Sequence, residues 1–172
     1  MDKAGSDADT RPRVMLVSRA FIARNSSPVS YLFVKRSLKN RHNPGKWEVP
    51  GGKLDEGEDL HVALAREIKE EVGFSVVLID SLALVKSYVI AGGPYQGLPY
   101  VVLFHIAKVG WRQPGDKDGI RLSDEHTEFR WATPEEALIL DLSDEVREAV
   151  TVLQTRLGGI DLKQDLWMRP LE

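Results

Sequence analysis

Short apolar runs, rich in β-branched and aromatic residues, alternate along the chain with polar or glycine- and proline-rich stretches. Such runs predict β-strands bounded by turns. The predicted strands cover residues 14–22, 30–35, 47–50, 74–79, 83–90, 100–109 and 127–132. The strand at 47–50 is expected to stop at Pro50, where two glycines follow.

Helical periodicity is clearest between residues 58 and 72. An apolar residue recurs every fourth position there and forms a single row, made of Leu60, Leu64, Ile68 and Val72. Gly73 follows as a C-terminal stop. Two further helices are expected, one after Thr133-Pro134 and one at 143–157. Many strands with interspersed helices predict an α+β or α/β sandwich.

The length of 172 residues suggests one domain, which we expect at residues 13–160. The polar stretch 1–12 is expected to be a mobile tail, and 161–172 is a tail without a clear class. No apolar run approaches the length of a membrane span. The absence of cysteine excludes disulfides, and the net charge of −3 argues against a non-specific nucleic-acid binder. We therefore expect a cytoplasmic protein with neither a membrane nor a nucleic-acid partner.

Three carboxylates lie beside the apolar row of the 58–72 helix. Glu67, Glu70 and Glu71 fall within an arc of roughly 100°. Like charges at these spacings destabilise a helix, and Arg66 reaches only Glu70, which leaves two carboxylates unpaired. A solvated acidic face is the ordinary interpretation of such a run, but Glu71 lies almost on the apolar row. Since Mg²⁺ prefers carboxylate oxygens, we expect a metal site here.

The segment from Gly52 to Phe74 resembles the Nudix box. That motif fixes nine positions over 23 residues, and this sequence fills every one of them, with Gly52, Glu58, Arg66, Glu67, Ile68, Glu70, Glu71, Gly73 and Phe74. The preceding residues 46–53 resemble the entry strand of MutT-like members of the family. The strand that contains Trp131 and leads into a helix also matches the order of elements in that family.

The resemblance implies an α/β/α sandwich with a mixed β-sheet between helices, and a pyrophosphohydrolase that uses Mg²⁺, with Mn²⁺ as the alternative. It assigns catalysis to Arg66, Glu67 and Glu70. It assigns the metal to Glu67, Glu70 and Glu71, to the carbonyl of Gly51 and to Glu125 from a distant loop, where Asp124 and Glu128 are near neighbours. Glu67 either binds the metal or acts as the base. Structural roles within the box are implied for Gly52, Glu58 and Gly73.

The resemblance leaves the substrate open. Hydrolysis of a nucleoside triphosphate to a monophosphate and pyrophosphate is the first hypothesis, with an ADP-ribose or dinucleoside polyphosphate hydrolase and a non-catalytic nucleotide sensor as alternatives. The expected substrate contacts are Lys35, Arg36, Lys53 and Trp47, although solvated or packed side chains explain these residues equally well. Tyr88, Phe33 and Phe104 could also stack on a base, but core packing is the more frequent role of aromatic residues. A homodimer is consistent with the family.

Overall fold

A computed structural model describes residues 13–24, 26–73, 75–92, 94–109 and 119–157. The elements follow in the order β1 (Met15–Arg24), β2 (Ser30–Arg36), β3 (Trp47–Glu48), β4 (Gly51–Lys53), α1 (Leu60–Val72), β5 (Val76–Val89), β6 (Pro99–Val109), β7 (His126–Ala132), α2 (Pro134–Ala137) and α3 (Asp144–Leu157). Phe74 and the two expected tails, 1–12 and 161–172, lie outside the described residues.

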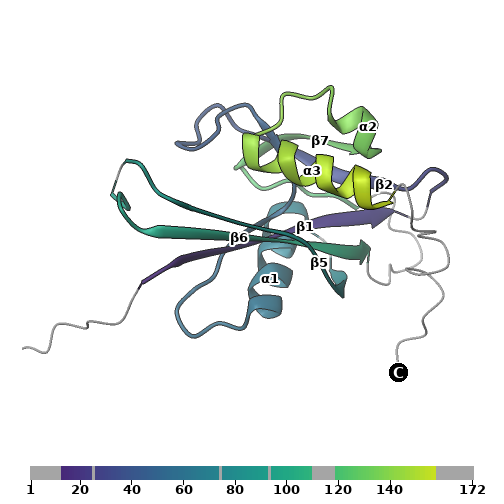
Figure 1. Cartoon of the computed structure of the whole chain (residues 1–172). Coiled ribbons are helices and arrows are strands. Elements are labelled where there is room, and N and C mark those ends of the chain that lie inside the picture. Colours follow the sequence, from purple (N-terminus) through teal and green to yellow (C-terminus); the bar gives the residue numbers. More distant parts are fainter. Residues whose placement is uncertain (1–12, 25, 74, 93, 110–118, 158–172) are drawn as a thin grey trace, which may run out of the picture.

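Within these ranges the strands form one seven-stranded mixed sheet. Its main order is β3-β2-β1-β6-β5, with β4 paired to β1 and β7 paired to β2. The β1–β6 pair is parallel, and the other strand pairs are antiparallel. Helix α1 lies on one face of the sheet and α2 and α3 lie on the other (Figure 1). The expected α/β/α sandwich with a mixed sheet between helices is confirmed.

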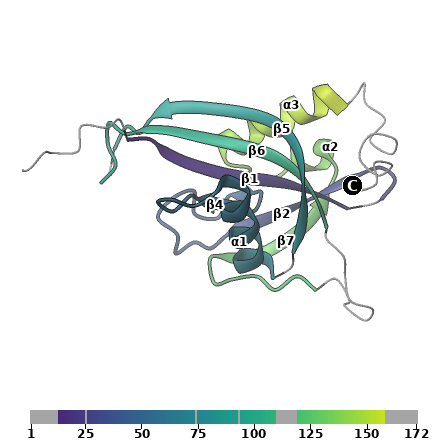
Figure 2. The same ribbon diagram turned by 90° about the horizontal axis from the view of Figure 1, so that it is seen from below.

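Alternation along the central strands separates two hydrophobic cores. On β1, Phe21 packs toward α3, whereas the next residue, Ile22, packs toward α1. This is the two-residue period of a strand that is buried on both faces. The core on the α1 side includes Leu64 and Ile68 from the predicted apolar row. The row therefore packs α1 against the sheet. The turned view shows the helix lying along that face of the sheet (Figure 2).

Helix α1 begins at Leu60, slightly later than predicted, because Asp59 acts as its N-cap. The Asp59 carboxylate accepts hydrogen bonds from the backbone N–H groups of His61 and Val62. Gly73 ends the helix in the left-handed conformation, with φ of 82°, and its N–H donates to the carbonyl of Lys69. Both ends of the helix are thus satisfied by the residue types expected there. No helix among the described residues is long and apolar enough to cross a membrane.

Two predicted strand boundaries were wrong. The strands expected at 74–79 and 83–90 are one strand, β5. Its register with β6 shifts near Asp80 and Ser81, and the strand continues through these two polar residues. The strand expected at 47–50 ends already at Glu48, and a further strand that was not predicted, β4, begins at Gly51 and pairs with β1. Gly51 makes this pairing feasible, because its φ is +135° and a Cβ there would lie 2.2 Å from the carbonyl oxygen of Ser18.

Candidate active site

Glu71 is the most buried carboxylate of the predicted metal cluster. Only 7% of the residue is exposed, and its Oε2 accepts a hydrogen bond of 2.9 Å from the backbone N–H of Gly51. Burial raises the pKa of Glu71 to about 7, although His126 and the Gly51 N–H act to lower it. A carboxylate in this position is costly to ionise unless a cation accompanies it.

Arg66 donates hydrogen bonds to three carboxylates, two on α1 and that of Glu58, which precedes the helix. Its Nε and Nη2 atoms each donate to Glu58 at 2.9 Å, and its Nη1 donates to Glu67 at 2.9 Å and to Glu70 at 3.3 Å. The prediction that Arg66 reaches only Glu70 was therefore wrong, because a guanidinium can spread its donors over several acceptors. Burial raises the pKa of Glu67, as do the charges of Glu70 and Glu125, against the opposing effect of Arg66.

Gly52 lets the carboxylate of Glu67 approach the sheet. A Cβ at residue 52 would lie 2.3 Å from Oε2 of Glu67, which no side chain can tolerate without displacing that carboxylate. Gly73 is restricted in a similar way, since its positive φ coincides with a Cβ position 3.0 Å from the Cβ of Arg121. Both glycines of the motif are thus explained by local geometry.

Glu125 is brought to the same region by β2 and the turn that follows it. Its carbonyl accepts hydrogen bonds from the backbone N–H of Ser37 at 2.8 Å and from Nδ2 of Asn40 at 2.9 Å. Its carboxylate is 57% exposed and lies 3.9 Å from Nη2 of Arg36. Its charge adds to burial in raising the pKa of Glu67.

Comparison with known proteins decides the family. The NUDIX domain model matches residues 15–153, most of the chain. The chain belongs to the NUDIX family. A curated relative, the nucleoside triphosphatase NudI of Salmonella newport (strain SL254), is 29% identical over 129 residues, which are 71% of this chain and 86% of that protein.

Solved structures agree with this Nudix assignment. The MutT protein from Methanosarcina mazei Go1 has 25% identity and a TM-score of 0.65, covering 89% of this chain and 100% of that one. A C. elegans Ap4A hydrolase binary complex has 24% identity and the same TM-score, over 86% and 100% of the two chains, a likeness that shows the fold. The expected α+β Nudix fold and MutT-like Nudix enzyme are therefore confirmed.

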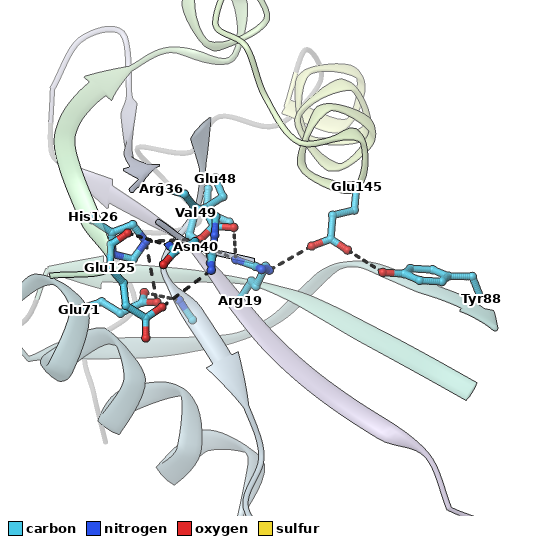
Figure 3. A network of polar contacts seen from close by, with 11 residues as sticks. Arg19, Arg36, Asn40, Glu48, Val49, Glu71, Tyr88, Glu125, His126 and Glu145 are labelled. Atoms are coloured by element: carbon cyan, nitrogen blue, oxygen red, sulfur yellow. Dashed lines mark hydrogen bonds and ion pairs between the residues drawn. The ribbon is translucent and has the colours of Figure 1, made fainter. Parts of the chain in front are cut away.

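The Nudix helix also adjoins a buried ionic network that the sequence did not reveal (Figure 3). Glu48 is 1% exposed and contacts Arg36 at 2.7 Å, Arg19 at 3.2 Å and His126 at 3.4 Å. Nε2 of His126 lies 4.0 Å from Oε1 of Glu71. The one available signal was the acidic residue within the predicted apolar strand 47–50, because nothing in the sequence connects it to His126, which is 5% exposed.

The expected substrate contacts of this Nudix site have different surroundings. Lys35 pairs with Glu128 at 2.6 Å, and the Nζ of Lys53 lies 5.0 Å from the ring centre of Tyr95. Trp47 is only 7% exposed and belongs to the hydrophobic core, as do the fully buried Phe33 and Phe104, whereas Tyr88 is 48% exposed. Their roles toward a substrate stay predictions.

The α1 carboxylates expected to bind metal each contact other groups of the chain. Among the residues that the structure describes, no three acidic or histidine side chains already form a group able to hold a metal ion. Glu67 and Glu70 contact Arg66, and Glu71 faces Gly51 and His126. Gly51 meets this cluster through its N–H, and the expected role of its carbonyl stays a prediction.

Proposed function

We propose that this Nudix protein is a Mg²⁺-dependent pyrophosphohydrolase that converts a nucleoside triphosphate to a monophosphate and pyrophosphate, with Mn²⁺ as an alternative cation. The observation that carries the proposal is the approach of two α1 carboxylates to β4, where Glu71 accepts from the Gly51 N–H and Glu67 lies against Gly52. The choice of a triphosphate is supported by the similarity to the nucleoside triphosphatase NudI and to a MutT protein.

The residues present fit a hard divalent cation. Their donors are carboxylate oxygens, the ligands that Mg²⁺ prefers. Burial of Glu71 penalises its charge, and within the described part of the chain no arginine or lysine forms an ion pair with it. Glu67, Glu70, Glu71, Glu125 and the carbonyl of Gly51 would hold the ion. When bound, such an ion neutralises phosphate charge and lowers the pKa of a bound water.

Glu67 is the residue best suited to remove a proton from the attacking water. Its carboxylate is partly buried between Gly52 and Arg66, and its raised pKa makes it a better proton acceptor than an ordinary glutamate. Arg66 is held in place by two hydrogen bonds to Glu58, and its hydrogen bond to Glu67 fixes the orientation of the Glu67 carboxylate. Arg36 lies 3.9 Å from Glu125 and Lys53 belongs to β4, and both are proposed to contact substrate phosphates.

A substrate panel tests the proposal. The purified protein with Mg²⁺ should release pyrophosphate from a nucleoside triphosphate, and Glu70→Gln or Glu71→Gln should lower kcat by at least about 100-fold with the fold intact. Glu135→Gln, an exposed carboxylate on α2, is the matched control and should keep full activity. Turnover of only ADP-ribose or a dinucleoside polyphosphate would overturn the triphosphate assignment. Thermal stabilisation by nucleotides without any turnover would overturn hydrolysis in favour of sensing.

One further variant separates the two roles open to Glu67. If Glu67 is the base, Glu67→Gln should lower kcat by about 10²- to 10⁴-fold while Mn²⁺ affinity, measured without nucleotide, stays near that of the wild type. If Glu67 is mainly a ligand, the affinity for Mn²⁺ should fall together with kcat.

A further inference from the structure

Glu48 connects its own strand, β3, to three other strands beside the carboxylate cluster. It lies on β3, and its Oε1 contacts Arg36 of β2 at 2.7 Å and His126 of β7 at 3.4 Å. Its Oε2 contacts Arg19 of β1 at 3.2 Å. A buried carboxylate is costly unless it is paired, and here Oε1 has hydrogen-bond partners whereas Oε2 is compensated only by the charge of Arg19.

The partners of Glu48 lie beside the carboxylates proposed to bind metal. Nη2 of Arg36 is 3.9 Å from Glu125, and Nε2 of His126 is 4.0 Å from Glu71. Both distances are at the outer limit for an ion pair, whereas Arg36 lies much closer to Glu48. Figure 3 shows Glu48 on the side of Arg36 and His126 away from Glu71.

The loop that carries Glu125 is fixed to the helix and to β2 through backbone contacts. Its Ser123 N–H donates to the carbonyl of Glu71 at 3.0 Å, and the carbonyl of Glu125 accepts from Ser37 and Asn40. These bonds place the Glu125 backbone, but they leave its carboxylate within reach of Arg36. What keeps that carboxylate available is therefore the stronger competing contact between Arg36 and Glu48.

We propose that Glu48 is a positioning residue that holds Arg36 and His126 away from Glu125 and Glu71, so that these two carboxylates stay available to a divalent cation. This role rests on the proposed metal-dependent hydrolysis. Without the charge of Glu48, Arg36 would pair with Glu125, and His126 would turn toward Glu71. Glu48 would then govern metal affinity without touching the metal or the substrate.

The test measures Mn²⁺ binding to the full chain in the absence of nucleotide, together with kcat and KM. Glu48→Gln should weaken Mn²⁺ binding by about 10- to 100-fold and lower kcat at limiting metal. The KM for nucleotide at saturating Mn²⁺ should rise as well, because the displaced Arg36 is also a proposed phosphate contact. Glu48→Asp keeps the charge on a shorter side chain, so its Mn²⁺ affinity should lie between those of the wild type and Glu48→Gln. It also serves as the measurable variant if Glu48→Gln does not fold. Glu135→Gln is the matched control for loss of one carboxylate.

A second substitution distinguishes positioning from simple loss of packing. The double variant E48Q/R36Q also removes Arg36, which E48Q releases. It should bind Mn²⁺ more tightly than E48Q, with an affinity closer to that of the wild type. A double variant that binds Mn²⁺ as weakly as E48Q, or more weakly, would overturn the positioning role, as would wild-type affinity in E48Q. Failure of the proposed function is read from the wild type instead: a wild-type protein without Mn²⁺ binding or turnover overturns both proposals.

Discussion

Single residues in this site are restricted by the space around them. Gly52 lies under the carboxylate of Glu67, and a Cβ there would come within 2.3 Å of it. Gly52→Ala should therefore displace the carboxylate and lower kcat by about 100-fold, since small misplacements of a reacting group have effects of that size. Steady-state kinetics at saturating Mg²⁺ measures the change. Gly92→Ala is the matched control, because nothing lies within 4 Å of its Cβ position; equal losses in the two variants would contradict the steric argument.

Glu71 makes the stability of the metal-free protein depend on pH. Burial raises its pKa to about 7 in the folded protein, above the ordinary value of 4.5. The folded state therefore holds a proton that the unfolded state has released, and stability falls as pH rises from about 4.5 to 7. Glu71→Gln has no such proton, so its stability relative to the wild type should increase across this range, by up to about 3 kcal/mol.

Urea unfolding at pH 5 and pH 8 in the presence of EDTA measures this difference between Glu71→Gln and the wild type. Glu70→Gln is the control, because Glu70 is an exposed carboxylate of the same helix. A stability difference between Glu71→Gln and the wild type that does not change with pH would contradict the raised pKa.

At the scale of elements, α1 depends on its N-cap. The Asp59 carboxylate accepts from two backbone N–H groups that have no partner within the helix. Asp59→Ala should lower the free energy of unfolding by about 1 kcal/mol, as measured by urea denaturation. Asp59→Asn retains an acceptor at the same position and should lose much less. Equal losses in the two variants would show that the cap contributes little.

The elements themselves were largely predictable, because their signals are local. The apolar row of α1, the stop at Gly73 and the apolar run of β1 depend on neighbours a few residues apart. Splitting β5 at Asp80 was wrong because its register irregularities with β6 depend on a partner strand that one sequence does not reveal. β4 was missed because two glycines resemble a turn unless the adjacent strand is known.

The site was predictable only where the motif specifies it. Arg66, Glu67, Glu70 and Glu71 follow from spacing within one helix. The contacts of Glu48 join it to residues 12 and 78 positions away, Arg36 and His126, and no periodicity connects such positions. Its burial among cations is a consequence of strand order, which local patterns do not determine.

At the scale of the whole molecule, only one face of the sheet packs against the helix that carries Glu67, Glu70 and Glu71. The carboxylates belong to α1, which packs in one core, whereas α3 packs in the other (Figure 2). The sheet between them is tightly packed, so a cavity on one face should perturb its own helix more than the helix across the sheet. Stability and metal binding should therefore respond separately to core mutations on the two faces.

Leu64 of α1 and Leu153 of α3 allow a matched comparison, because both are leucines exposed by 2% or less. Leu64→Ala and Leu153→Ala should each destabilise the protein by about 2–5 kcal/mol in urea unfolding. At a temperature where circular dichroism shows both variants folded, only Leu64→Ala should also weaken Mn²⁺ binding and lower kcat, because its cavity lies under the helix that carries the carboxylates. If Leu153→Ala impaired Mn²⁺ binding equally, the site would depend on the rigidity of the entire sheet, and the separation of the two faces would be wrong.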